Sequence, residues 1–187
     1  MGRVSEVRFL APSSFATLLT PIIGLIIALS LGNIVLLNYV HVISGGTWTG
    51  IDLFMGVVMT RVIRGVSPDA RVEIVKRLVP LMLFLMPALA SVAITSGLYL
   101  AQWEGLLDFR SPLIIAAGII ATVLTVQGFG IIMPTEIRIF LELRKEKPDK
   151  DRVVRLGMRN IRVAGSQAIF QIAIIYVMAN LAFGVRL

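Results

Sequence analysis

Long apolar segments constrain the fold of this chain more than any other feature. Four apolar blocks cover residues 15–63, 78–102, 111–143 and 152–184. Only 16% of residues are charged, 57% are hydrophobic, and the mean hydropathy is +0.88. About 20 residues suffice for a helix to cross the hydrocarbon of a bilayer, and a helix satisfies its own backbone polar groups there. The blocks therefore predict an all-α integral membrane protein.

The first block is too long for a single crossing and needs a break. Gly32 and Asn33 carry turn chemistry, and the rival break is the Gly45-Gly46 pair. We prefer the first, because residues 34–64 then form one long helix whose polar residues share a face. The prediction is a single transmembrane domain over residues 1–187, a five-helix bundle with a four-helix core plus an N-terminal helix that is not cleaved. The expected helices are approximately 15–31, 34–64, 78–102, 111–143 and 152–184.

The distribution of charge predicts an orientation. Basic residues gather in residues 61–77 and 144–162, whereas residues 103–110 carry Glu104, Asp108 and a single Arg110. Cytoplasmic loops carry an excess of Lys and Arg, so we expect the two basic segments to be cytoplasmic. The chain would then be a multi-pass protein of the plasma membrane with its N-terminus inside and its C-terminus outside. Topology also explains the net charge of +7 better than nucleic acid binding does.

The composition excludes several kinds of site. The chain has no cysteine, which excludes disulfides, thiolate metal sites, iron–sulfur clusters and cysteine nucleophiles. His41 is the only histidine, which excludes a multi-histidine zinc site within one chain.

One stripe of the predicted second helix combines small and polar residues. At 100° per residue it holds His41, Gly45, Trp48, Asp52, Met55, Gly56 and Met59. His41 would lie near the outer edge of the hydrocarbon. A neutral imidazole ligates iron through one nitrogen when the other donates a hydrogen bond, here to Ser44 or to a carbonyl one turn back. The glycines at 45 and 46 would leave room for a porphyrin. The alternative is a histidine that simply hydrogen-bonds a neighbouring helix.

Besides His41, four polar side chains are expected inside the membrane: Asp52, Gln127, Glu136 and Arg162. Asp52 would lie about 16 Å deeper than His41, where a charged Asp costs about 2.5–3.5 kcal/mol. Its carboxyl group should be protonated, paired or facing water, either for proton transfer or for a hydrogen bond between helices. Pro134 should kink the fourth helix. The arginines at 152, 155, 159 and 162 share one face of the last helix and are expected to meet lipid phosphates or loop carboxylates. The alternative is that Arg162 reaches inward to pair with Glu136.

The pattern H-x3-G-x2-W-x-G, formed by His41, Gly45, Trp48 and Gly50, resembles a broad group of small membrane proteins. The group includes membrane-bound protoporphyrinogen oxidases, copper-resistance D-type domains and the membrane domain of bacterial urate hydroxylases. The later segments GFGIIMPTEIRIF and RNIRVAGSQAIFQIAIIYVMAN are similar to that urate hydroxylase domain. The resemblance implies haem b with its iron on His41. The single histidine departs from bis-histidine ligation, and no C-x-x-C-H motif is present.

These observations lead to one expected function and two alternatives. We expect a b-type haem-binding membrane redox or electron-transfer protein, or a subunit of a respiratory complex. The alternatives are a cofactor-free structural subunit, and proton or cation transport through Asp52 and Glu136. The expected partners are the lipid bilayer, other membrane subunits or a second copy, and a quinone. No catalytic residue is indicated.

Overall fold

The computed structural model describes residues 12–184, and this part of the chain forms five helices and no strand. Four of these helices are long and apolar enough to cross a membrane, over Ile34–Gly65, Pro68–Trp103, Pro112–Leu143 and Lys150–Ala182. The prediction of an all-α membrane bundle with four long helices and an N-terminal helix is therefore confirmed.

A tight turn at residues 31–33 separates α1 (Pro12–Ser30) from α2 (Ile34–Leu53). Gly32 has φ +60°, a backbone conformation that glycine adopts without strain. Asn33 then caps α2, since its side chain accepts a 2.9 Å hydrogen bond from the Leu36 N–H. The predicted break is confirmed, and the Gly45-Gly46 pair lies inside α2.

The second crossing continues from α2 through a π-helical segment, η1 (Phe54–Met59), into α3 (Thr60–Gly65). A π-helical turn accommodates extra residues, so it shifts the direction of every side chain that follows. The uniform 100° stripe did not anticipate this shift.

The third crossing, α4 (Pro68–Trp103), begins ten residues before the expected start at residue 78. Ser67 caps its first turn by accepting a 3.4 Å hydrogen bond from the Ala70 N–H, and Pro68 occupies the first helical turn. Proline is favoured there because the N–H that it lacks would have no acceptor within the helix. Residues 68–77, expected to lie in a connection, therefore form the first turns of a basic helix.

The fourth crossing contains α5 (Pro112–Thr125), a second π-helical segment, η2 (Val126–Ile132), and α6 (Met133–Leu143). The irregular segment lies directly before Pro134, which cannot donate a backbone hydrogen bond, so it falls where a kink was expected. The final helix, α7 (Lys150–Ala182), is capped by Asp149, whose side chain accepts a 2.8 Å hydrogen bond from the Arg152 N–H.

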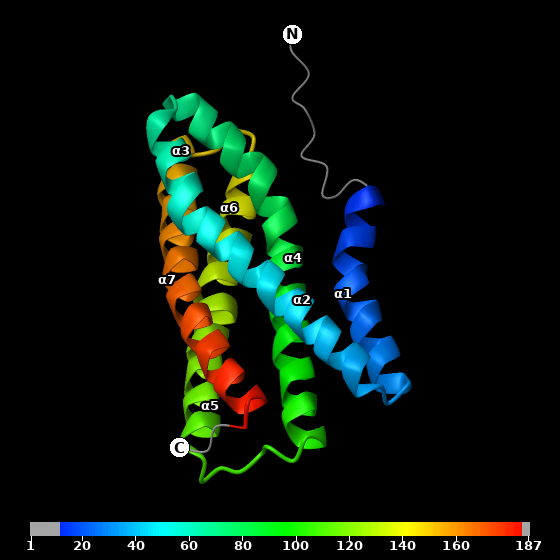
Figure 1. The fold of residues 1–187 in the computed structure, drawn as a ribbon. Coiled ribbons are helices and arrows are strands. Elements are labelled where there is room, and N and C mark those ends of the chain that lie inside the picture. The colour runs from blue at the N-terminus through cyan, green and yellow to red at the C-terminus, as the bar shows by residue number, and fades with distance from the viewer. Residues whose placement is uncertain (1–11, 185–187) are drawn as a thin grey trace.

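The helices pack as a bundle that α2 crosses obliquely, and α1 lies at its side against α2 and α4 (Figure 1). The α3–α4 turn and the α6–α7 connection lie at one end, and the α4–α5 loop lies at the other (Figure 1). A 2.8 Å ion pair between Lys150 and Asp69 links the two basic regions. The shared end of the basic regions agrees with the expected topology, and the side of the membrane that it faces stays a prediction.

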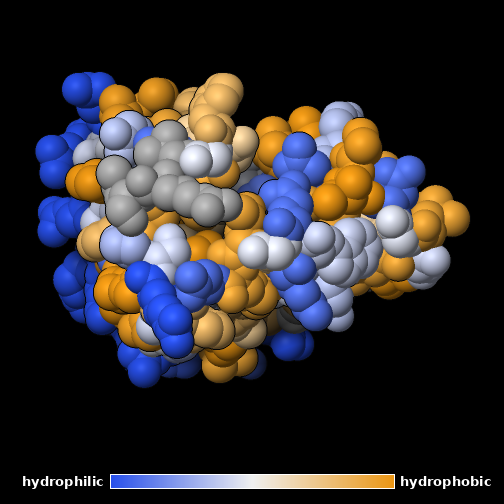
Figure 2. Space-filling model, turned by 60° about the horizontal axis from the view of Figure 1, so that its bottom comes forward, coloured by the Kyte–Doolittle hydropathy of each residue, from blue (hydrophilic) through white to orange (hydrophobic). Residues whose placement is uncertain are grey.

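The outer surface is strongly apolar. Val35, Ile119 and Ile169 are 75%, 60% and 69% exposed. Figure 2 shows apolar residues over much of the face turned to the viewer, with hydrophilic residues along the left edge and in separate groups at the centre and right. A surface of this kind is typical of contact with lipid, because soluble proteins rarely expose large apolar patches to water.

Candidate functional site

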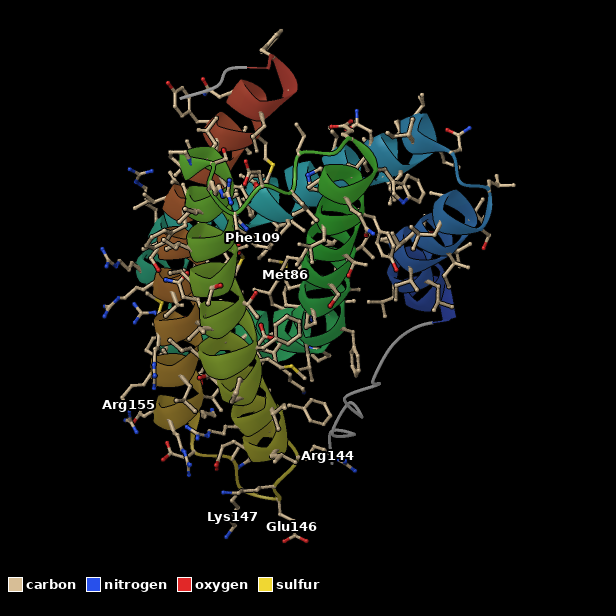
Figure 3. All side chains as sticks on the ribbon, turned by 90° about the horizontal axis from the view of Figure 1, so that it is seen from below. Met86, Phe109, Arg144, Glu146, Lys147 and Arg155 are labelled. Carbon is tan, nitrogen blue, oxygen red and sulfur yellow. The ribbon has the colours of Figure 1, made fainter. Side chains whose placement is uncertain are left out.

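The interior of the bundle contains a cavity of about 60 Å³ between α2, α4, α6 and α7. Its walls are mostly apolar, and Met86 of α4 points into the space between α4 and α5 (Figure 3). Four polar side chains interrupt these walls: Asp52, Glu136, Asn160 and Gln167. About 10–15 Å³ of such space accommodates one water molecule, so the cavity has room for several.

Asp52 is the most buried polar group of the cavity, with no exposed surface. It lies on the inward face of α2, one turn after Trp48, which also lines the cavity. Its Oδ2 accepts a 2.9 Å hydrogen bond from Nε2 of Gln171 on α7, while Oδ1 has no hydrogen-bond partner among the described residues. One oxygen of Asp52 is therefore fixed by α7, and the other is free to accept a donor.

Glu136 brings a second carboxyl group to the same cavity. It lies in the first turn of α6, two residues after Pro134, and only 6% of its surface is exposed. Its Oε2 has no partner in the described part of the chain, and its carboxyl group lines the same cavity as that of Asp52. Among the described residues that line the cavity none is Lys, Arg or His, so no cationic side chain compensates this pair.

Unpartnered oxygen atoms accumulate in and around the cavity. Nδ2 of Asn160 donates a 3.1 Å hydrogen bond to the Ile132 carbonyl. Oδ1 of Asn160 is buried and receives no hydrogen bond in the described chain. The amide oxygens of Gln127 and Gln171 are also buried and without donors in the described chain. A buried polar group left unpaired costs about 1–3 kcal/mol. Since all of these atoms are acceptors, together they favour a guest that brings protons or positive charge.

The other predicted polar residues lie in different environments. Gln127 does not line the cavity, and its Nε2 lies 3.3 Å from the Ser166 hydroxyl on α7. Arg162 is exposed and lines a groove on the outer side of α7. Glu136 lies in the interior cavity, whereas Arg162 is exposed at the groove between η1 and α7. No ion pair joins the two among the described side chains, so the alternative pairing of Arg162 with Glu136 is not formed.

His41 makes its hydrogen bonds to α4. Its Nδ1 lies 2.9 Å from the Ala93 carbonyl and 3.2 Å from the Ser96 hydroxyl, in place of the expected acceptors at Ser44 or one turn back. A carbonyl oxygen accepts only, so Nδ1 carries the hydrogen and Nε2 keeps its lone pair. The structure thus shows the helix-to-helix hydrogen bond that was the alternative interpretation of this histidine.

The space beside His41 does not fit a haem between α2 and α4. A Cβ added at Gly97 of α4 would lie 2.8 Å from Cε1 of the His41 ring, so the ring rests directly on α4. Gly45 also faces α4, because a Cβ there would lie 3.9 Å from that of Ala93. Nothing lies within 4 Å of a Cβ added at Gly46. A Cβ at Gly45 would make only an ordinary van der Waals contact with α4, and the space for a porphyrin expected at Gly45 and Gly46 stays a prediction.

Comparisons with protein-family models, with curated proteins and with solved structures find no match to this chain. The site is therefore interpreted from its own geometry.

Sequence reasoning missed two parts of this site. Asn160 was not expected to reach the cavity, since it follows a run of exposed arginines on α7. The partners of His41 were also missed, although the spacing of Ala93, Ser96 and Gly97 in ASVAITSG marks a helix face with small side chains.

Proposed function

We propose that this protein moves protons through the membrane by way of Asp52 and Glu136. The observation that carries the proposal is the shared cavity, in which two buried carboxyl groups lie without a cationic side chain among its described lining residues. Two ionised carboxylates in a low-dielectric interior repel each other, so a proton bound between them stabilises the pair. The site can therefore take up a proton and release it.

The surrounding groups suit proton exchange. Water molecules in a cavity of about 60 Å³ would donate to the free oxygens of Asp52, Glu136 and Asn160 and would connect the carboxyl groups. Gln171 holds one oxygen of Asp52, so the carboxyl group keeps a fixed orientation while its other oxygen gains or loses a proton.

A proton suits this site better than a divalent metal ion. The described residues contain no cluster of three or more His, Cys, Asp or Glu side chains suited to holding a metal. Ca²⁺ takes six to eight oxygen ligands, and Mg²⁺ requires a nearly ideal octahedron. Two carboxyl groups and a few amide oxygens in an apolar cavity provide too few oxygen ligands for either ion.

Proton flux into liposomes tests the proposal. The purified protein is reconstituted with a pH-sensitive dye inside, and a potassium gradient with valinomycin sets the membrane potential. We expect proton uptake that falls at least about tenfold in Asp52→Asn and in Glu136→Gln, because neither amide can take the place of the carboxyl group in proton transfer. Glu104→Gln, in the exposed α4–α5 loop, is the matched control and should retain the flux. Equal flux in all four proteins, or flux of Na⁺ alone, would contradict the proposal.

A b-type haem protein is the second candidate, and one observation favours it. The Nδ1–H of His41 donates to a backbone carbonyl, as the metal-ligating histidines of many proteins do, and leaves Nε2 for iron. The packing against Gly97 excludes a haem between α2 and α4, so this haem would have to approach from the outer surface. A visible spectrum of the purified protein tests this candidate. A Soret band that disappears in His41→Ala supports it, whereas no haem after reconstitution removes it and favours proton movement or a structural subunit.

A further inference from the structure

A groove of about 410 Å³ runs along the outside of the bundle between η1 and α7. It forms where the two backbones touch, since a Cβ added at Gly56 would lie only 2.5 Å from Cα of Gly165. Ala168 extends this floor of small residues, while Val57 and Ile169 rise as exposed walls. Ile161 lines both this groove and the cavity that holds Asp52 and Glu136, so the two are neighbouring spaces with that side chain between them.

The groove has a different chemistry at each end. Arg162 and Thr60 lie at the end nearest the basic connections, and Leu53, Ile169 and Ile172 line the rest. From Arg162 to Ile172 the helix rises about 15 Å, half the thickness of the hydrocarbon core. A cationic group at the membrane surface followed by an apolar channel of this length matches a lipid with an anionic head and an acyl chain.

Positive charge surrounds the polar end. Arg155, Arg159 and Arg162 are exposed on successive turns of α7, and no ion pair involves them among the described side chains. Figure 3 shows Arg155 pointing away from the bundle. Arginine binds phosphate through two parallel hydrogen bonds, and such charge-assisted bonds are stronger than those between neutral groups.

We propose that this groove binds one anionic phospholipid, with its phosphate on Arg162 and an acyl chain between η1 and α7. The charge favours a lipid over a second copy of this chain. A symmetric dimer would place the same surface against itself and bring two sets of unpaired arginines together. An anionic lipid instead neutralises the arginines, while its chain covers the exposed walls of the groove.

Native mass spectrometry of the detergent-purified protein tests this site, with phosphatidylglycerol and phosphatidylcholine as probes. We expect the wild-type protein to retain one phosphatidylglycerol in preference to phosphatidylcholine. Arg162→Gln should lower the apparent affinity for phosphatidylglycerol about tenfold, the loss expected for one charge-assisted hydrogen bond. Ile169→Trp, which fills the groove from its exposed wall, should reduce retention of both lipids.

Arg138→Gln is the matched control, because Arg138 is also an exposed arginine but lies on α6 outside the groove. It should leave the retained lipid unchanged. An equal loss in Arg138→Gln and Arg162→Gln would show diffuse attraction to the basic surface and overturn the proposal. Retention that does not distinguish the two lipids, or a lipid-free dimer, would also overturn it.

Discussion

Nε2 of Gln171 donates a 2.9 Å hydrogen bond to Oδ2 of Asp52, across 119 positions of the sequence. Both side chains are almost completely buried, so the bond joins α7 to α2 in the interior of the bundle. The two carboxyl oxygens of Asp52 therefore differ: Oδ2 accepts the bond from Gln171, and Oδ1 has no hydrogen-bond partner in the described chain.

The first prediction concerns the strength of this bond. Asp52→Asn keeps an acceptor for Gln171 and should be tolerated, whereas Asp52→Leu should weaken the bundle. Hydrogen bonds between membrane helices average about 0.6 kcal/mol and reach about 1.7 kcal/mol, so Gln171→Leu should cost an amount in that range. Thermal unfolding in detergent measures the change. Gln102→Leu, at an exposed position near the end of α4, serves as control. An unchanged midpoint in both Asp52→Leu and Gln171→Leu would show that the bond contributes nothing to stability.

The second prediction concerns the contact between η1 and α7. Gly56→Ala adds a methyl group where the Gly165 backbone lies 2.5 Å away, so one helix has to move. We expect a loss of about 1–3 kcal/mol, the usual cost of overpacking. Gly46→Ala meets open space and should be neutral, or stabilising by up to about 1 kcal/mol through helix propensity. Equal stability of the two variants would contradict the close approach of these helices.

The third prediction concerns the place of His41 on α4. Gly97→Ala puts a methyl group 2.8 Å from Cε1 of the ring, which should displace the ring and break its bond to Ala93. Unfolding of the single variants and of the double variant Gly97→Ala/His41→Ala measures the coupling. If the two residues touch, the double variant should recover part of the stability that Gly97→Ala loses. Strictly additive losses would show that the ring lies elsewhere. Gly118→Ala, which meets nothing within 4 Å, is the control.

The fourth prediction concerns orientation. The basic connections lie at one end of the bundle, and basic segments resist translocation. Ser67→Cys and Asp149→Cys should therefore be shielded from an impermeant thiol reagent added to intact cells, while Glu104→Cys should react. The chain has no native cysteine to confuse the result. Labelling of Ser67→Cys from outside would reverse the topology.

The sequence predicts the helices well because long apolar blocks and turn residues are local signals. Asn33 caps α2 in the way its position after Gly32 indicates, and the start of α4 was wrong only because the Ser67-Pro68 cap was overlooked. The buried position of Asp52 follows from helical periodicity. Its pairing with Gln171 does not, because that contact depends on how α7 rotates against α2.

The π-helical segments explain why the uniform stripe predicted along the second crossing does not hold for its whole length. A π-helical turn contains more residues than an α-helical turn, so different side chains face inward after Leu53 and after Thr125. No local sequence pattern predicts where such a turn occurs. The alternative pairing of Arg162 with Glu136 could not be decided from the sequence, because residue type alone does not indicate the face of α7 on which an arginine lies. The place of the His41 ring could not be predicted from its own helix, because the absence of a side chain at Gly97 of α4 makes room for it.

Proton exchange at Asp52 and Glu136 is the central claim, and infrared difference spectroscopy of the reconstituted protein tests it most directly. Stepping the bath pH should change the absorption of protonated carboxyl groups inside the membrane. We expect Asp52→Asn and Glu136→Gln each to remove part of this signal, whereas Glu104→Gln should leave it unchanged. A carboxyl signal that is identical in the wild-type protein and in all three variants would show that the two buried groups do not exchange protons with water, and would contradict the account.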